Sequence, residues 1–484
     1  MHESGSWTRE DFVRRSAAGA LALGTAFAPR WVGDALAAVG KEPVTVHRFH
    51  SRTDLVPPIV TVLEHREGVS AGHLFLAPNS GPGHRGPLLV DDFGHVIWTH
   101  NTRPVTAMNF RAGVYKGKPV LTWWEGRTTR GLGDGTHVIV DNSYREVLRV
   151  PAGNKRPSDL HEFVLTDRGT ALVTAWERQT GNLSGVGGPS SGPVIGGVVQ
   201  EIELPSGRVL FEWRSLDHVA IDESHQPYSA KGAYDYFHVN SVELDHDGNY
   251  LVSARNTWAV YKIDRHTGKV LWRLGGKKSD FKMGPGTVFA WQHDARRHGG
   301  SNYLLSLFDD GAMPPVQPQS KALVLELDLR RMTASVYRKL THRPSVLAWA
   351  LGSVQVLPNH NVLVGWGTSP YITEYDREGR VVFDARLPKG GENYRALRMP
   401  WKGLPAKAPD LIRKYEHGKH VVYASWNGAT ELAAWRVEAT GNSSAYRKTG
   451  FETKLVAPGG VKRIEITPLD HKGKPLHAAK AIKV

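Results

Sequence analysis

Three histidines and one arginine occupy matching positions in a pattern of short apolar strands that repeats along the chain. The repeated strands end in bulky side chains, namely Trp124, Trp176, Arg255, Phe308 and Trp366. His161, His238 and His293 precede three successive strand ends at nearly the same spacing. Near neutral pH an imidazole can act as a nucleophile, a proton carrier or a metal ligand. Three of them at one register of a repeat indicate a functional site, although any single one could be a structural hydrogen-bonding residue.

The arginine among these positions favours an anionic ligand. Three histidines could ligate a metal ion, but a guanidinium in the same ring disfavours a dication. Its fork of donors matches sulfate, phosphate or carboxylate, so we expect no metal. Aromatic strand ends could stack on an aryl group of the ligand. The predicted substrate-binding residues are Trp124, Trp176, Phe308, Asn240 and Trp366.

Two series of strands recur six times and predict the fold. In the first, a turn precedes an apolar strand at residues 92–98, 206–211, 267–272 and 378–383, with weaker copies at 141–148 and 328–337. The second series lies at residues 74–76, 120–124, 172–176, 251–255, 304–308 and 362–366. Six units of four short strands are typical of a six-bladed β-propeller, in which ring closure leaves no exposed sheet edge. A large β-sandwich or a β-helix is the alternative.

The chain divides into four predicted segments. Residues 1–37 are an export signal, and residues 41–389 are the propeller. Residues 390–418 are a linker with helical character, and residues 419–484 are a small β-sandwich of immunoglobulin or fibronectin type. The sandwich is predicted because short strands alternate with turns in that region.

The amino-terminal segment carries the features of an export signal. Arginines at positions 9, 14 and 15 precede an apolar run at 16–28 and a small-residue cleavage motif at 35–37. The apolar run is shorter than the roughly 20 residues that cross a bilayer. The charged region resembles a twin-arginine signal, which exports folded proteins, but Glu10 replaces its second arginine. We expect a secreted protein without a stable membrane span after processing; a general secretory signal is the alternative.

Composition excludes several classes of function. The formal net charge is +14, but the lysines and arginines are scattered, so we expect anionic small-molecule ligands rather than nucleic acid. The chain has no cysteine, which excludes disulfides, thiolate catalysis and a lipoprotein anchor. No phosphate-binding loop for a nucleotide is present, and we expect no cofactor. The sequence gives no prediction of oligomeric state.

Four short blocks resemble a known enzyme family. They are residues 158–163, 237–242, 253–256 and 291–295, which read SDLHEF, FHVNSV, SARN and WQHDA. They are similar to the signature blocks of the bacterial arylsulfotransferases, which need no nucleotide sulfate donor. The resemblance implies a six-bladed propeller that moves a sulfuryl group from an aryl sulfate to a phenol through a sulfohistidine. It implies that His293 is the nucleophile, with His161, His238 and Arg255 around the sulfuryl oxygens.

The predicted function is therefore nucleotide-independent aryl sulfotransfer by a ping-pong route. An aryl sulfate is the expected donor and a phenol the expected acceptor. Transfer of a sulfuryl group spreads negative charge over three oxygens, so preorganised donors such as Arg255 suit this chemistry. A non-catalytic propeller that binds anionic aromatic or sugar ligands is the alternative from another class. A third possibility is a propeller hydrolase or lactonase that uses a metal.

Overall fold

The computed structural model describes residues 44–299 and 303–484, and the predicted export signal lies outside this range. The described residues form 34 β-strands and three 3₁₀ helices, and they contain no α-helix. The short helices are η1 (Ser184–Val186), η2 (Ser215–Asp217) and η3 (Ile221–Glu223). The protein is therefore all-β, as predicted. No helix in this part of the chain has the length and apolar character needed to cross a membrane.

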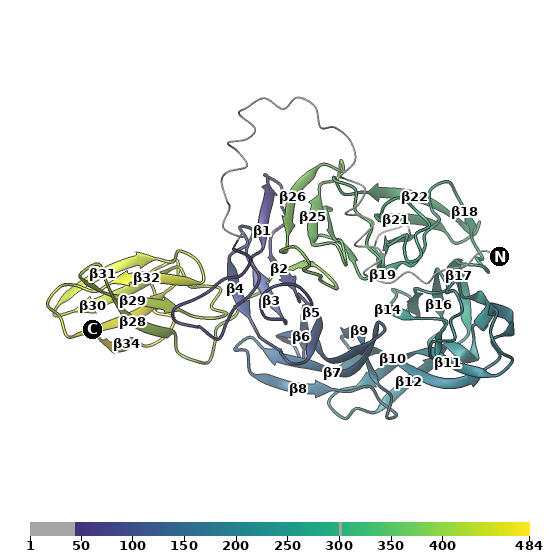
Figure 1. The fold of residues 1–484 in the computed structure, drawn as a ribbon, viewed down its shortest axis with the longest axis horizontal. Helices are drawn as coiled ribbons and strands as arrows, with labels where there is room; N and C mark the ends of the chain where they lie inside the picture. Colours follow the sequence, from purple (N-terminus) through teal and green to yellow (C-terminus); the bar gives the residue numbers. More distant parts are fainter. Residues whose placement is uncertain (1–43, 300–302) are drawn as a thin grey trace, which may run out of the picture. The chain divides into compact units, whose positions relative to one another are not determined.

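Meanders of four antiparallel strands follow one another along the chain (Figure 1). Two of them join in one nine-stranded sheet through a single pair of residues, Gly135 and Ser158, and β13 pairs with β11 at its far side. The strands of this sheet are β5 (Thr106–Tyr115), β6 (Lys118–Thr129), β7 (Leu132–Asp141), β8 (Glu146–Val150), β9 (Ser158–Leu165), β10 (Thr170–Gly181), β11 (Gly192–Glu203), β12 (Val209–Arg214) and β13 (Tyr234–Asp235).

Three further meanders have sheets of their own. The first has the order β14-β15-β16-β17, and the second has the order β19-β20-β21-β22 with β18 added at β22. Their strands are β14 (Val239–Leu244), β15 (Tyr250–Ala254), β16 (Ala259–Ile263), β17 (Val270–Gly275), β18 (Lys282–Met283), β19 (His293–His298), β20 (Tyr303–Asp309), β21 (Lys321–Asp328) and β22 (Thr333–Leu340). In the third, β1 (Thr61–His65) pairs with β26 at the edge of β23 (Ser353–Val356), β24 (Val362–Gly365), β25 (Tyr371–Tyr375) and β26 (Val381–Arg386).

One four-stranded sheet is assembled from distant parts of the chain. Strand β27 (Leu397–Met399) pairs with β2 (His73–Leu76), and β3 (Leu88–Val90) and β4 (Val96–Thr99) complete the sheet. The prediction of a linker at 390–418 is wrong here, because this segment supplies a strand to the first sheet. Its expected helical character is also wrong, since β28 begins at Asp410.

The carboxyl-terminal residues form two sheets whose strands pair only with each other among the described residues. The strands are β28 (Asp410–Glu416), β29 (Lys419–Ser425), β30 (Ala434–Ala439), β31 (Asn442–Arg447), β32 (Glu452–Val456), β33 (Arg463–Leu469) and β34 (Lys480–Lys483). Buried residues of both sheets, including Val422 and Trp435, share one hydrophobic cluster. The predicted start at residue 419 would separate β29 from its hairpin partner β28, so this region begins near Asp410.

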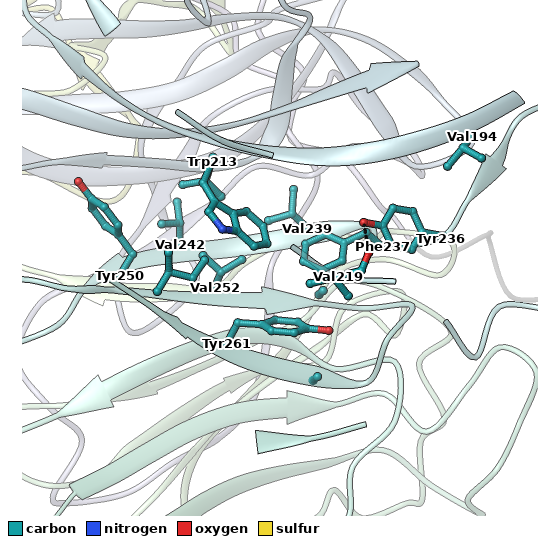
Figure 2. Packing of buried hydrophobic residues seen from close by; sticks show 14 of the residues in the cluster. Val194, Trp213, Val219, Tyr236, Phe237, Val239, Val242, Tyr250, Val252 and Tyr261 are labelled. Carbon is teal, nitrogen blue, oxygen red and sulfur yellow. Dashed lines mark hydrogen bonds between the residues drawn. The ribbon is translucent and has the colours of Figure 1, made fainter. Parts of the chain in front are cut away.

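The largest hydrophobic cluster holds the backbone next to His238. Phe237 and Val239 flank this histidine and are 0% and 4% exposed. Figure 2 shows Phe237 and Tyr261 packed among the aromatic and branched side chains of the cluster, which spans strands β10 to β16. Burying one such side chain contributes about 1.5–3 kcal/mol. The apolar neighbours therefore fix the position at which the polar histidine leaves the core.

Candidate active site

The structure brings the three predicted histidines together. His161 lies in β9, His238 directly precedes β14, and His293 is the first residue of β19. The ring centroids of His161 and His238 are 5.0 Å apart, and those of His161 and His293 are 6.3 Å apart. The three strands open successive meanders, so residues at one register of the repeat converge. His161 and His293 are each 1% exposed, while the side chain of His238 is 10% exposed.

β-Bulges shape the strands that carry these residues. The pairing register shifts between Val173 and Ala175, opposite β9, and also at Val239/Ser241 in β14 and at His293/Arg296 in β19. His238 and Asp294 have φ angles of 54° and 57°, in the left-handed region that non-glycine residues rarely adopt. A bulge bends a strand and redirects side chains, and bulges are common beside active sites. The irregularities therefore direct polar groups of successive strands toward one another.

Each histidine is held through Nδ1 by an aspartate. The Nδ1–Oδ2 distances are 2.5 Å for His161 and Asp159, 2.5 Å for His238 and Asp235, and 2.8 Å for His293 and Asp310. Hydrogen bonding at one ring nitrogen orients the imidazole and leaves the other, Nε2, for chemistry. The sequence reasoning missed these partners. The short spacings Asp159–His161 and Asp235–His238 were a usable signal, whereas nothing in the sequence linked His293 to Asp310.

His293 is kept neutral by its surroundings. Burial lowers its pKa well below the usual value, and the nearby charge of Arg255 lowers it further. Burial also raises the pKa of Asp310 well above its usual range, an effect that Arg255 opposes. Burial is thus the main cause of the neutral imidazole, and the arginine adds to it. A neutral imidazole keeps the lone pair that a nucleophile needs.

Arg255 is fixed by one aromatic ring and two oxygen atoms. Its guanidinium carbon lies 4.7 Å from the ring centroid of Trp291. Its Nη1 donates to Asn256 Oδ1 at 3.0 Å and its Nη2 donates to the Trp349 carbonyl at 3.2 Å. Behind Trp291, the ring of Trp258 packs edge-on at 5.1 Å. These contacts orient the Arg255 guanidinium beside His238. Within residues 44–299 and 303–484, no carboxylate forms an ion pair with it.

A cavity of about 670 Å³ adjoins His238, whereas His161 and His293 are buried and do not line it. Residues that line it include His238, Arg255, Asn256, Gly131, Met313 and Trp349. Its size falls within the range of roughly 300–1,000 Å³ that is typical of small-molecule sites. The described residues contain no group of three or more His, Cys, Asp or Glu side chains arranged to hold a metal ion.

The predicted substrate-binding aromatics do not line this cavity. Trp124, Phe308 and Trp366 are 0% exposed, so no ring face is available to a ligand. Trp124 Nε1 donates to the Ser158 carbonyl, and Trp366 Nε1 donates to Thr373 Oγ1, each at 3.0 Å. These residues lie in or directly after the second strand of a meander, and their rings pack within hydrophobic clusters. The prediction for these three residues is therefore wrong.

The side chains of the other two predicted substrate-binding residues also donate hydrogen bonds to the protein itself. Asn240 is 0% exposed, and its Nδ2 donates to the Gln292 carbonyl at 2.6 Å. Trp176 is partly buried, and its Nε1 donates to the Gly133 carbonyl at 2.7 Å. Gly133 belongs to a glycine-rich hairpin, and a Cβ there would approach the Trp124 ring within 2.8 Å. The glycines thus permit close ring packing, and neither Asn240 nor Trp176 lines the cavity.

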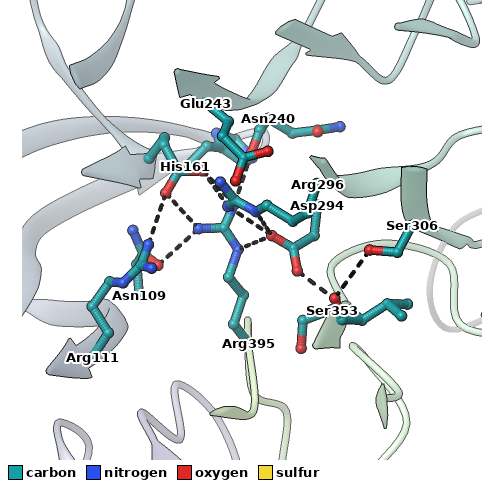
Figure 3. Close-up of polar contacts among 12 residues, drawn as sticks. Asn109, Arg111, His161, Asn240, Glu243, Asp294, Arg296, Ser306, Ser353 and Arg395 are labelled. Carbon is teal, nitrogen blue, oxygen red and sulfur yellow. Dashed lines mark hydrogen bonds and ion pairs between the residues drawn. The ribbon is translucent and has the colours of Figure 1, made fainter. Parts of the chain in front are cut away.

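A buried charge cluster, which the sequence reasoning missed, lies beside His161 (Figure 3). Glu162, next to His161, accepts hydrogen bonds from both terminal nitrogens of Arg395 at 2.8 and 3.1 Å and also pairs with Arg296. Arg395 Nε lies 3.1 Å from Asp294. Burial would raise the pKa of Glu162, but the arginines lower it to about 2. Removing one partner from such a buried network typically costs about 3–5 kcal/mol.

Tyr394 links this charge cluster to the histidines. Its hydroxyl donates to the carbonyls of His161 and Asn240 at 3.2 and 3.0 Å. Its ring centroid lies 5.5 Å from that of His161 and 6.4 Å from that of His293, edge-on in both cases. Tyr394 and Arg395 lie in the segment that the sequence reasoning assigned to a linker. No repeat or motif marked them.

The fold and the site thus define a class of protein. It is all-β and built of propeller-like units, and three imidazoles, each held by an aspartate, lie with an arginine at one site. The chain belongs to the arylsulfotransferase (ASST) family, whose model matches residues 111–387. The match contains all four residues predicted to be catalytic. None of the curated proteins compared with the chain shows significant similarity.

Several solved structures resemble the chain at low sequence identity. A protein of unknown function from Bacteroides caccae is 13% identical, with a TM-score of 0.42 over 67% of this chain and 98% of that chain. The GH43 BlXynB protein from Bacillus licheniformis is 12% identical, with a TM-score of 0.34 over 87% of this chain and 84% of that chain. The Dos1 propeller is 10% identical, with a TM-score of 0.31 over 76% and 93%.

Proposed function

We propose that the protein transfers a sulfuryl group from an aryl sulfate to a phenol through a sulfohistidine at His293, without a nucleotide donor. Membership of the arylsulfotransferase family supports sulfuryl transfer between aryl oxygens. The observation that carries the proposal is a neutral, buried His293 that is hydrogen-bonded to Asp310 and lies near the charge of Arg255. A neutral imidazole beside a cation suits attack on an anionic sulfate ester.

In the first half-reaction, Nε2 of His293 attacks the sulfur atom. The N–S bond forms as the bond between sulfur and the aryl oxygen breaks, and the aryl oxygen leaves with the bonding electrons. His238, which lines the cavity, gives that oxygen a proton when the phenol is a poor leaving group. Arg255 stabilises the negative charge on the sulfuryl oxygens, and His161 lies next to the reacting histidine.

The second half-reaction reverses these steps with the acceptor. His238 takes the proton of the acceptor phenol, whose oxygen attacks sulfur as the N–S bond breaks. His293 recovers its lone pair, and the proton lent in the first half-reaction is returned. Because Asp235 accepts from Nδ1 of His238 at 2.5 Å, the ring presents Nε2 for this proton transfer.

We also propose an arrangement of the sheets and a cellular location for the protein. Five meanders along the chain and the sheet completed by β27 support a ring of six blades. The two carboxyl-terminal sheets with one shared cluster support a β-sandwich from about Asp410 onward. The amino-terminal sequence supports export by the twin-arginine route, after which the protein would act outside the cytoplasm.

The test is an assay of the mature protein with 4-nitrophenyl sulfate, with and without a phenol acceptor. Release of nitrophenolate that depends on the acceptor, with formation of the aryl sulfate of that acceptor, is the expected result. Tight binding without turnover would instead identify a non-catalytic binding module. Hydrolysis that requires an added metal ion would identify a metal-dependent hydrolase.

We predict that sulfuryl transfer persists below pH 6.5. Protonation of His293 would block attack, and a lowered pKa means that the imidazole stays neutral as the pH falls through 6.5, the ordinary value. The measurement is the rate of adduct formation with donor alone between about pH 4 and about pH 8, a range that brackets the ordinary histidine pKa of about 6.5. A decline centred above 6.5 would contradict the prediction and would indicate that protonation of Asp310 limits the reaction.

A further inference from the structure

The cavity beside His238 carries more positive charge than a sulfate ester can neutralise. Its lining contains three cations, Arg130, Lys231 and Arg255, and one carboxylate, Asp235. The carboxylate of Asp235 already accepts a hydrogen bond from Nδ1 of His238. An aryl sulfate brings a single negative charge, which the proposed function places at Arg255. The charges of Arg130 and Lys231 therefore remain for another group.

Arg130 is held in place at the cavity. Its Nη1 donates to the carbonyl oxygen of Lys231. Gly232 has a φ of +114°, and a Cβ at this position would lie 2.2 Å from Nη1 of Arg130. A side chain at residue 232 would thus displace the guanidinium. Neither Arg130 nor Lys231 forms an ion pair with a carboxylate in residues 44–299 or 303–484.

The same cavity offers an apolar wall to an aryl ring. Trp349 and Met313 line it and remain 40% and 39% exposed. Exposed large apolar side chains beside a polar site are suited to an aromatic ligand. The Trp349 carbonyl accepts a hydrogen bond from Arg255, so this wall begins beside the proposed sulfuryl site. A ring against Trp349 could therefore have its sulfated oxygen near Arg255 and a substituent elsewhere in the cavity.

We infer that the aryl substrate carries a second anionic substituent, such as a carboxylate, which Arg130 and Lys231 bind. This inference rests on the proposed function and adds the chemical class of the acceptor. Both side chains are exposed, so each contact with an anion is comparable to a surface ion pair, and the two cations act together in one concave site. Bidentate recognition by a guanidinium further favours a planar carboxylate over a neutral polar group.

The experiment compares 3-(4-hydroxyphenyl)propionate with its methyl ester as acceptors of the sulfuryl group from 4-nitrophenyl sulfate. The two compounds share the reacting phenol and differ in the distal charge. We expect the native protein to prefer the acid in kcat/KM by about 5- to 10-fold, as two partly exposed charge contacts allow. The preference should shrink as salt is added.

Variants identify the source of the preference. In the double variant Arg130→Gln/Lys231→Gln, the acid-to-ester ratio should fall to about one. Lys472→Gln, which removes a positive charge from an exposed turn of the carboxyl-terminal region, should retain the native ratio. A native ratio near one, or a ratio that the double variant leaves unchanged, would overturn the inference.

Calorimetric binding of the acid and the ester separates this inference from the proposed function. Preferential binding of the acid that is lost in the double variant would support the anion site even if no sulfuryl transfer occurred. Equal binding of acid and ester, or binding of neither, would overturn the anion site even if simple phenols were sulfated.

Discussion

The His293→Asn protein should form no sulfuryl adduct and should lose turnover by about 10³-fold or more, as expected when a nucleophile is removed. An amide can occupy the space of the imidazole, but it cannot supply the attacking nitrogen. Brief exposure of the native protein to donor alone should leave an acid-labile SO3 group on the peptide that contains His293. Mass spectrometry of the quenched protein measures this adduct directly.

Matched variants test whether the effect is specific to this nitrogen. His298→Asn changes a histidine of the same strand, which bonds Ser306 Oγ at 2.6 Å, and it should retain adduct formation. His161→Asn and His238→Asn should slow adduct formation but leave it detectable. Full transfer activity in His293→Asn, with the fold intact, would disprove the proposed mechanism.

The second large effect is expected for Asp310→Asn. Attack through Nε2 leaves the imidazole of His293 with a growing positive charge, which the carboxylate bonded to Nδ1 stabilises. An amide keeps the shape but removes the charge, and changes of this kind reduce histidine-dependent rates by about 10²- to 10⁴-fold. The measurement is the single-turnover rate of adduct formation as a function of donor concentration.

The concentration dependence distinguishes a positioning residue from one that binds substrate. Asp310 is 0% exposed and does not line the cavity, so the donor concentration at half-maximal rate should change little while the maximal rate falls. Asp328→Asn, which removes a carboxylate at the end of β21 that accepts hydrogen bonds from the following turn, is the matched control. A normal maximal rate in Asp310→Asn would show that the hydrogen bond to Asp310 does not activate His293.

The strands were predictable because their signals are local. The turn-and-strand series corresponds to β4, β8, β12, β17, β22 and β26, and the second series corresponds to β2, β6, β10, β15, β20 and β24. Alternation of apolar residues and the intervening turns depend only on neighbouring residues. The all-β class and the family followed from such local patterns, and the grouping of His161, His238 and His293 followed from the register of the repeat.

The failures have a common physical cause, which is that sequence spacing does not give side-chain direction across a sheet. Trp124, Phe308 and Trp366 share a register with one another, but they lie in or directly after the second strand and pack within hydrophobic clusters. Arg255 directly follows β15, as Trp366 directly follows β24, yet Arg255 lines the cavity and Trp366 is buried. Only the structure separates these cases.

The contribution of Tyr394 and Arg395 could not be predicted either. Arg395 pairs with Glu162, far away along the chain, and β27 pairs with β2 from the opposite end. Contacts at such separations leave no periodic signal in a single sequence. The partnership of His293 with Asp310 was missed for a similar reason, since two adjacent aspartates after a strand are also common in turns.

Because Arg395 lies late in the sequence, the ribosome adds it long after it adds Glu162. At a synthesis rate of about 5–20 residues per second, roughly 10–50 s separate the appearance of Glu162 from that of Arg395. Once residue 293 has been added, the nascent chain contains all three histidines of the site, but it still lacks their complete ionic support and the strand that completes the first sheet. The centre of the molecule can therefore reach its final form only near the end of translation, which delays sulfuryl transfer until most of the polypeptide exists.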